Sequence, residues 1–308
     1  ITLLRTSPPR TQSWNSDETA TLEGAENVDP QRPGLFVGNH ALMGVLDSPL
    51  FVYELYRQTG VFPRSLGDHF HFPTPVWGKL VTRFGAVPGT RENCRRLMES
   101  GQHVLVFPGG AREVAKRRDE INKLVWKKRT GFVYMAIEQG FDIIPFASLG
   151  CDEAYDIVYD GDDFANGWLG KRLLGNDKIN SLMRGGDLFM PLVKGIGPTL
   201  LPKAEPFRFA IGKPIPTAHL QGQEKDPAVL WQLREQVSDA ITGMLSRMDE
   251  ERKEQPRPLW RKFLGEIKVG GDPIDPGALP PAMARRLKDL AAERPGVCFL
   301  AETRRIMN

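Results

Sequence analysis

His40 and Asp47 are the two side chains of this sequence best suited to acid–base chemistry. His40 follows a short apolar run, 35–37, that is typical of a buried strand. An imidazole titrates near neutral pH, so it can accept a proton from a hydroxyl group. A carboxylate on its other ring nitrogen would fix the tautomer and stabilise the imidazolium that forms. The pair therefore predicts a general base oriented by Asp47. Taken alone, a structural histidine near a helix-start carboxylate is the simpler interpretation.

Two arginines and two glycines could complete such a site. Arg91 and Arg112 follow predicted strand ends, where a guanidinium could hold a phosphate or carboxylate through paired hydrogen bonds. Gly109 and Gly110 would let a ligand approach the backbone, whose N–H groups could stabilise an oxyanion. Each also has a structural interpretation: a helix end, a plain turn, or an ion pair with Glu113 or another carboxylate. With a general base, the set suits acyl transfer from a thioester to an alcohol, which requires no covalent nucleophile.

The elements that must position these residues follow from the alternation of short apolar runs and helical stretches. The expected strands are Leu35–Val37, Phe84–Val87, Val104–Phe107, Ile143–Ala147 and Phe207–Ile211. The expected helices cover 48–59, 73–83, 91–100, 128–139 and 226–251. Alternation of this kind predicts an α/β fold with a mostly parallel central sheet flanked by helices.

The chain divides by composition into three parts. Residues 1–33 are polar and contain several prolines, which indicates an N-terminal arm. Residues 34–254 form the predicted main domain, although 151–202 is an acidic stretch followed by Gly-rich apolar sequence that fits neither helix nor strand. Residues 255–308 are expected to form a linker rich in Pro and Gly and a C-terminal helical extension, with a last helix at 281–293.

Composition excludes several classes of protein. The net charge of +3 over 308 residues gives no argument for nucleic-acid binding. The three cysteines, Cys94, Cys151 and Cys298, include no CxxC pair, which argues against a disulfide framework and indicates a reducing compartment. His69 and His71 have no third ligand at a suitable spacing, so we expect no metal and no redox cofactor. Cys94, on a predicted helix, is expected to be inert.

Membrane contact is expected at the surface only, on the cytoplasmic face of a membrane. No run of about 18 apolar residues could span a bilayer, and the first residues do not form a signal peptide. A basic run between 112 and 129 could attract anionic head groups or the phosphates of coenzyme A, with Trp126 as an interfacial anchor. Its members are Arg112, Lys116, Arg117, Arg118, Lys123, Lys127, Lys128 and Arg129. The apolar segment 186–202 is a second candidate for an acyl tunnel or membrane contact; a solvated face and core packing are the respective alternatives.

Four blocks occur in an order and spacing that resemble the glycerolipid acyltransferase superfamily, the lysophosphatidic-acid acyltransferase group. They are Asn39-His40 with Asp47, then 84–91, 106–113 and 143–146. The resemblance covers roughly 35–215. The Phe-Pro-Gly-Gly-Ala-Arg-Glu version at 107–113, followed by 127–133, is similar to the branch that contains diacylglycerol acyltransferases and plant phytyl-ester synthases.

The resemblance implies roles for individual residues. His40 and Asp47 would be catalytic, and the substrate-binding residues would be Asn39, Arg91, Gly109, Gly110, Arg112 and Glu113. Acyl-CoA or acyl carrier protein would be the co-substrate. The six residues between His40 and Asp47 exceed the usual spacing of the family. Gly109 stands where phospholipid-making members carry a glutamate, which implies a less polar acceptor.

The predicted reaction transfers a fatty acyl group to a lipid alcohol such as a diacylglycerol or a long-chain alcohol. A lysophospholipid is the alternative acceptor. Two other classes stay open: a thioesterase-type hydrolase in which His40 activates water, and a non-catalytic lipid-binding module. Free acid formed without added alcohol would favour the hydrolase, and the long His40–Asp47 spacing is the feature that favours the binding module.

Overall fold

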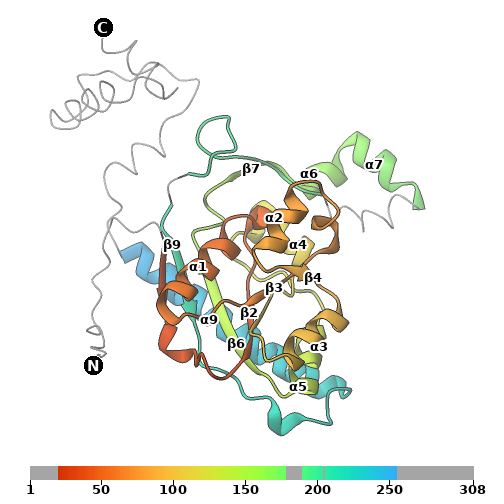
Figure 1. The fold of residues 1–308 in the computed structure, drawn as a ribbon. Coiled ribbons are helices and arrows are strands. Elements are labelled where there is room, and N and C mark those ends of the chain that lie inside the picture. Colours follow the sequence, from red (N-terminus) through yellow and green to blue (C-terminus); the bar gives the residue numbers. More distant parts are fainter. Residues whose placement is uncertain (1–19, 178–188, 204, 255–308) are drawn as a thin grey trace, which may run out of the picture. The chain divides into compact units, whose positions relative to one another are not determined.

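A computed structural model describes residues 20–177, 189–203 and 205–254 of the chain (Figure 1). The predicted linker and C-terminal extension, 255–308, lie outside the described residues, as does most of the predicted arm. All described residues belong to the first of the two parts into which the chain divides, 1–265.

A seven-stranded sheet with the order β1-β9-β6-β2-β5-β3-β4 forms the centre of this part. The strands are β1 (Ala20–Glu23), β2 (Gly34–Gly38), β3 (Arg64–Gly67), β4 (Val87–Pro88), β5 (Val104–Val106), β6 (Asp142–Leu149) and β9 (Phe207–Ile211). All neighbours pair in parallel except β6 and β9, which are antiparallel. The predicted α/β fold with a mostly parallel sheet is therefore confirmed.

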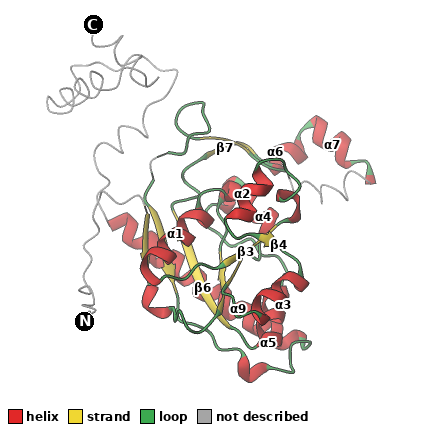
Figure 2. Cartoon of the chain, viewed as in Figure 1, coloured by secondary structure: helices red, strands yellow, loops and turns green. Residues whose placement is uncertain are grey.

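Helices cover both faces of the sheet (Figure 2). They are α1 (Asp47–Thr59), α2 (Trp77–Arg83), α3 (Arg91–Glu99), α4 (Gly110–Val114), α5 (Gly131–Gln139), α6 (Gly161–Asn166), α7 (Trp168–Leu174) and α9 (Pro227–Glu254). The five predicted helices are confirmed, with starts shifted by up to four residues at α2. Short 3₁₀ turns lie at η2 (Leu42–Gly44), η3 (His69–His71) and η4 (Arg118–Glu120).

The alternation of side chains along β2 separates two hydrophobic cores. Leu35 and Val37 point into the core shared with α3, α5 and α9, whereas Phe36 points into the core shared with α1. All three side chains are fully buried. A strand buried on both faces is apolar without interruption, which is why the run 35–37 was recognisable in the sequence.

Two regions differ from the sequence-based expectation. The predicted strand 84–87 is wrong for its first three residues: Phe84 caps α2, and Gly85 has a φ of 82°. Only β4, at 87–88, remains extended. In the segment 151–202, β7 (Asp156–Tyr159) and β8 (Leu192–Lys194) form a separate antiparallel ribbon, and α6 and α7 lie between them in sequence.

The edge strand β1 lies within the range 1–33, where we expected an arm; its backbone pairs with β9 through residues 20–23. Among the described residues, no helix is long and apolar enough to cross a membrane.

Candidate active site

The loop between β2 and α1 brings His40 and Asp47 together. His40 lies just beyond the end of β2, and Asp47 is the first residue of α1. His40 Nδ1 is 2.7 Å from Asp47 Oδ2. The same oxygen accepts the Ala41 N–H at 2.7 Å. The pairing predicted from the sequence is thus present in the structure, despite the long spacing.

The 3₁₀ turn η2 accommodates the extra residues of this loop. Met43 and Gly44 both adopt a φ of 65°, which folds the chain back on itself between β2 and α1. A Cβ on Gly44 would lie 2.9 Å from His40 Cε1 and 2.6 Å from Val114 Cγ1. Position 44 therefore requires glycine, both for its left-handed backbone and for the close approach of the His40 ring.

Phe107, which follows β5, fixes the other side of the imidazole. The two rings are stacked, with centroids 3.9 Å apart and planes inclined by 9°. The His40 side chain is 16% exposed, whereas Asp47 is fully buried. Because Nδ1 faces Asp47, Nε2 is the ring nitrogen that can receive a proton from a substrate.

The buried Asp47 carboxylate is held in its charged form. Burial is the largest influence on the pKa of Asp47 and by itself would raise it. The charge of His40 and its hydrogen bond act in the opposite direction. Backbone hydrogen bonds from Ala41 and Ser48 add to the effect, and the net result lowers the pKa of Asp47. A carboxylate in this state can stabilise an imidazolium on His40.

A second buried ion pair supports the same loop. Lys116 Nζ donates to Asp152 Oδ2 at 2.6 Å, and the two side chains are 0% and 2% exposed. The backbone N–H of Leu42, inside η2, donates to Asp152 Oδ1 at 2.6 Å, and that of Asn122 donates to Oδ2 at 2.7 Å. Burial by itself would lower the pKa of Lys116, but Asp152 and Glu113 reverse the effect and raise it. Sequence reasoning missed this pair, because it placed Lys116 in a surface run.

Glu113, predicted to bind substrate, is fully buried on α4. Its Oε1 accepts the Val125 N–H at 3.2 Å. Burial raises the pKa of Glu113 to about 7, and the nearby Lys116 and His40 only partly oppose the shift. The side chain packs against the backbone of Gly109, where a Cβ would lie 2.1 Å from Glu113 Oε2. Glycine at 109 is thus required for space.

Asn39 connects the end of β2 to β6. Its side-chain amide donates to Ser148 O at 2.8 Å, and its Oδ1 accepts the Ser148 N–H at 2.8 Å. The side chain is 1% exposed. These bonds fix the chain immediately before His40, which is a positioning function; the predicted contact of Asn39 with substrate stays a prediction.

Arg112 and Gly110 are also engaged within the protein. The buried Arg112 guanidinium forms two hydrogen bonds with Glu120, at 2.8 and 2.5 Å. This is the structural alternative that the sequence left open. Gly110 donates its N–H to Phe107 O at 3.0 Å, which removes that group as a ready oxyanion donor. The predicted oxyanion function of the neighbouring Gly109 stays a prediction.

Arg129 is a further residue of this loop whose place the sequence did not indicate. Its Nη1 donates to the carbonyl oxygens of Pro108 and Gly109, at 2.7 and 2.6 Å. The guanidinium therefore holds the turn that precedes α4. The distance in sequence, about twenty residues, left no local pattern by which this contact could have been recognised.

Arg91 lies apart from these buried groups. It is exposed at the first position of α3, and its guanidinium lies 5.2 Å from the centroid of the Tyr134 ring. An anion is favoured at the N-terminal end of a helix, so this position remains compatible with the predicted contact to a phosphate.

The predicted membrane contact of the basic run is wrong at its anchor. Trp126 is 1% exposed and packs against Phe132 in the core, because its apolar ring fills the space beside α5. Lys116 is also buried, and Arg118 is paired with Asp160 and Asp163 of the acidic stretch. Of the run, Arg118, Lys123, Lys127 and Lys128 are exposed.

Cys94 is not suited to nucleophilic catalysis. It is 3% exposed on α3, and burial raises the pKa of its thiol to about 11. Its thiol therefore stays protonated at neutral pH, in agreement with the predicted inertness.

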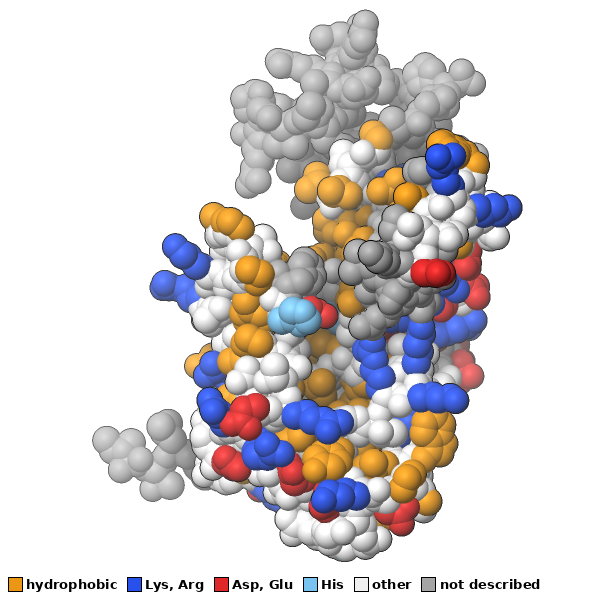
Figure 3. All heavy atoms as spheres, turned by 90° about the vertical axis from the view of Figure 1, so that its right-hand side faces the viewer, with side chains coloured by type: hydrophobic (Ala, Val, Ile, Leu, Met, Phe, Trp, Pro, Cys, Tyr) orange, Lys and Arg blue, Asp and Glu red, His pale blue; other side chains and the backbone are white. Residues whose placement is uncertain are grey.

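One face of the protein is hollowed and lined largely by hydrophobic side chains (Figure 3). Lys and Arg side chains gather around the lower half of the hollow (Figure 3). A ligand with an apolar chain and an anionic group suits such a face.

Comparisons with known proteins agree with an acyltransferase site. Residues 19–149 match the family model described as Acyltransferase. The chain is 31% identical over 250 residues to phytyl ester synthase 1, chloroplastic, of Arabidopsis thaliana, which corresponds to 75% of this chain and 35% of that protein. It is 31% identical over 142 residues to the Homo sapiens DGAT1/2-independent enzyme synthesizing storage lipids, or 46% of this chain and 42% of that protein. The chain thus spans less than half the length of these curated relatives.

Among solved structures, the 1-acyl-sn-glycerophosphate (LPA) acyltransferase PlsC from Thermotoga maritima matches with a TM-score of 0.43 and 14% identity. The match covers 78% of this chain and 74% of that one.

Proposed function

Because the chain belongs to the Acyltransferase family, we propose that it transfers a fatty acyl group from acyl-CoA or acyl carrier protein to a lipid alcohol. The observation that carries the proposal is the 2.7 Å contact between His40 Nδ1 and the buried Asp47. It leaves Nε2 of an oriented imidazole for the acceptor. The family predicted from the four sequence blocks is confirmed by the family model and the relatives.

The proposed reaction needs one base and no covalent intermediate. His40 Nε2 takes the proton of the acceptor hydroxyl as its oxygen attacks the thioester carbonyl. The tetrahedral intermediate collapses, the C–S bond breaks, and the thiolate leaves with the electron pair. The imidazolium, stabilised by Asp47, then returns the proton to the thiolate. The products are an ester and a free thiol.

The donor and acceptor assignments rest on separate arguments. The exposed Arg91 at the start of α3 is the proposed anchor for phosphates of the donor. For the acceptor, residue 109 is a glycine, so the turn before α4 carries no acidic side chain at this position. This favours a weakly polar alcohol such as a diacylglycerol or a long-chain alcohol. The relatives are named for ester and storage-lipid synthesis. Peripheral attachment to a membrane surface is part of the proposal, since both products and acceptors of this kind reside in lipid.

A panel of acceptors tests the proposal. Palmitoyl-CoA and palmitoyl-acyl carrier protein would each be supplied with diacylglycerol, a long-chain alcohol, lysophosphatidic acid or no acceptor. Thiol release and lipid products would be followed together. We expect ester formation that depends on diacylglycerol or the long-chain alcohol. Equal thiol release without an acceptor would identify a hydrolase, and preference for lysophosphatidic acid would reassign the acceptor.

A further inference from the structure

The short helix α2 presents apolar side chains to the surface. Its buried Gly78 packs against the backbone of Phe72, where a Cβ would lie 2.1 Å from the carbonyl oxygen. The opposite side of the helix therefore faces outward. The outward apolar residues are Val76, Trp77, Leu80 and Phe84, with exposed fractions of 80%, 39%, 43% and 65%. We give the name α2 surface to these four residues together with Tyr56, Lys79 and Arg83.

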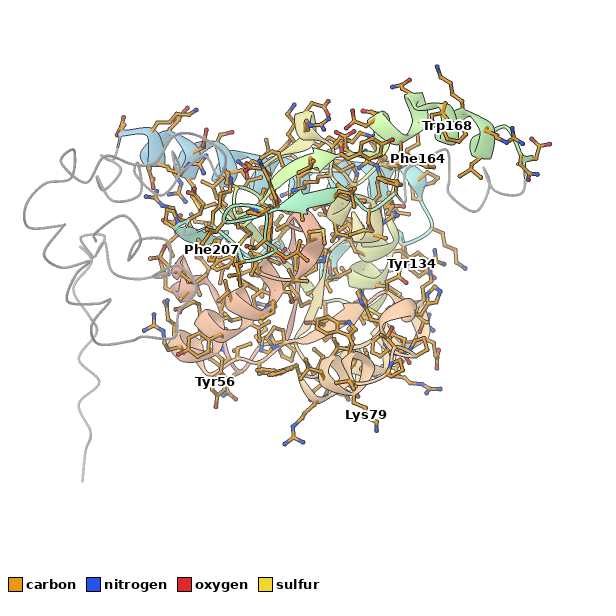
Figure 4. All side chains as sticks on the ribbon, turned by 90° about the horizontal axis from the view of Figure 1, so that it is seen from above. Tyr56, Lys79, Tyr134, Phe164, Trp168 and Phe207 are labelled. Carbon is orange, nitrogen blue, oxygen red and sulfur yellow. The ribbon has the colours of Figure 1, made fainter. Side chains whose placement is uncertain are left out.

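The apolar area continues onto α1. Phe62 lies against Gly85, the residue after Phe84: a Cβ added at Gly85 would lie 3.0 Å from Phe62 Cε1. Its ring contacts Tyr56 of α1 edge to face, at a centroid distance of 6.2 Å. Tyr56 is 56% exposed. Figure 4 shows Tyr56 and Lys79 projecting from the same side of the protein. The area is thus continuous across two helices, which scattered exposed residues would not be.

The charges on this area all have one sign. Lys79 and Arg83 are exposed on the same outward side of α2. The stretch 69–91 contains no Asp or Glu. The nearest acidic residue in sequence before it, Asp68, lies 3.4 Å from His69. Aromatic side chains beside lysine and arginine are the combination found at the interface between a bilayer and water.

Val76, the residue before α2, has a strained backbone. It precedes α2 with a φ of 64° and a ψ of −55°, a conformation that a β-branched residue rarely adopts. The cost of such a backbone persists where the surroundings or a function require it. Here the strained residue holds its apolar side chain 80% exposed.

The α2 surface adjoins the candidate active site. Trp77 Nε1 lies 3.1 Å from His71 Nδ1 in η3, the turn that precedes α2. The turn η3 follows β3, which pairs in parallel with β5, and Phe107 just beyond β5 stacks on His40. A lipid that enters beside α2 would therefore have a short path to the general base.

We propose that the α2 surface docks the protein onto a bilayer containing anionic lipids. The proposal rests on the proposed function and deepens it, because it names the surface through which a lipid acceptor reaches His40. The apolar side chains enter the boundary between head groups and acyl chains, and Lys79 and Arg83 contact the anionic head groups. It replaces the contact that the sequence placed at Trp126, which is buried.

The exposed residues Leu200 and Leu201 belong to the segment 186–202, the other candidate for membrane contact, and offer a matched comparison. They are 70% and 65% exposed, but they lie beyond β8, and Lys203 nearby is paired with Asp156 at 2.7 Å. Trp168 of α7 is also exposed, and Figure 4 shows it on a different side of the protein from Lys79.

Sedimentation with vesicles tests the proposal on the full chain without any acyl donor. Wild type is expected to bind vesicles of phosphatidylcholine with phosphatidylglycerol more tightly than phosphatidylcholine alone. Lys79→Gln with Arg83→Gln should weaken that binding about 25-fold at low salt, since each charge contributes about a factor of five. Leu80→Ser with Phe84→Ser should weaken it about tenfold or more. Leu200→Ser with Leu201→Ser should bind as wild type does.

The outcomes separate this proposal from the proposed function. His40→Ala should bind vesicles normally, so loss of turnover and loss of docking are measured independently. Circular dichroism and melting temperature establish that each variant is folded. The two double variants of α2 test the same surface independently, one by its charges and the other by its apolar side chains. The proposal is overturned if wild type does not bind anionic vesicles, if both α2 variants bind as wild type, or if the Leu200 and Leu201 variant loses as much binding as they do.

Discussion

At the scale of single residues, the imidazole of His40 is defined by its two neighbours. Asp47 occupies Nδ1 at 2.7 Å, and Phe107 stacks on the ring. The carboxylate fixes the tautomer that leaves Nε2 able to accept a proton, whereas the stacking fixes the plane of the ring. Catalysis and substrate binding should therefore be separable by substitution.

Replacement of the orienting carboxylate tests this separation. Asp47→Asn should lower kcat about 10²- to 10⁴-fold, because an amide can donate to Nδ1 and favour the wrong tautomer. The KM values for donor and acceptor should change little. Steady-state kinetics on the purified variant measure both quantities. Asp156→Asn, which alters an exposed carboxylate paired with Lys203, is the control. A kcat of Asp47→Asn equal to that of the control would show that Asp47 does not orient the base.

Glu113 predicts a pH dependence of stability. Burial raises its pKa in the folded protein to about 7 from an ordinary value of 4.5. Between these values the folded state binds more protons than the unfolded state, so the free energy of unfolding should fall as pH rises through this window. The loss from this group is at most about 3 kcal/mol. Urea denaturation at pH 5, 6 and 7.5, taken as roughly spanning the window, should show the decline in wild type and a flatter profile in Glu113→Gln. An identical slope in both proteins would rule out the assignment.

The sequence predicted the His40–Asp47 pair because both members lie in one short loop next to a recognisable strand. It did not predict Lys116–Asp152, whose members are 36 residues apart. A lysine within a run of basic residues resembles a surface lysine, and its burial depends on a partner that the fold supplies. Arg112 and Trp126 were misplaced for the same reason, since local composition carries no information about tertiary packing.

At the scale of elements, the turn η2 and the ion pair beneath it determine where the general base lies. Gly44 permits the His40 ring to pack against the turn, and Asp152 accepts the N–H of Leu42 inside the turn at 2.6 Å. The long loop is therefore ordered by defined contacts on both sides, which explains how it keeps Asp47 within reach of His40.

The turn can be tested at Gly44. Gly44→Ala introduces a Cβ into a left-handed backbone and toward His40 Cε1 at 2.9 Å, so activity should fall at least about tenfold. Gly60→Ala is the matched control: Gly60 has a φ of 75°, and nothing lies within 4 Å of its added Cβ. Both variants should lose about 1 kcal/mol of stability from backbone strain. Kinetics and thermal melts distinguish them; equal activity in both would mean that the turn does not position His40.

The buried ion pair predicts a large effect from a single substitution. Lys116→Met leaves Asp152 charged and without its lysine, which should lower the free energy of unfolding by about 3 to 5 kcal/mol. Lys116→Met with Asp152→Asn removes the stranded charge but keeps an acceptor for the Leu42 N–H. This double variant should recover part of the loss. Urea denaturation measures both, and a double variant less stable than the single one would contradict the ion-pair account.

Elements with continuous apolar sequence were predicted well, and short or partly exposed ones were not. β2, β5, β6 and β9 carry buried apolar residues at nearly every position. β3 has only half-buried residues and β4 has two residues, so neither gave a clear pattern. The ribbon of β7 and β8 pairs residues more than thirty positions apart through bulged, partly exposed strands, which local periodicity cannot reveal.

At the scale of the whole molecule, the candidate site draws its parts from neighbouring strands. His40 follows β2 and Phe107 follows β5, and these strands pair in parallel. The carboxyl ends of parallel strands meet at one edge of a sheet, where α/β proteins commonly bind ligands. The α2 surface adjoins this edge through η3, so the proposed lipid contact and the proposed chemistry lie close together.

The most direct test of the central claim follows thiol release and ester formation together, from palmitoyl-CoA and the best acceptor of the panel, with wild type and His40→Gln. Wild type should form one ester for each thiol released, and His40→Gln should lose about 10²- to 10⁴-fold in both rates while remaining folded. Ester formation by His40→Gln at the wild-type rate would contradict the account, because the acceptor hydroxyl would then lose its proton to another group.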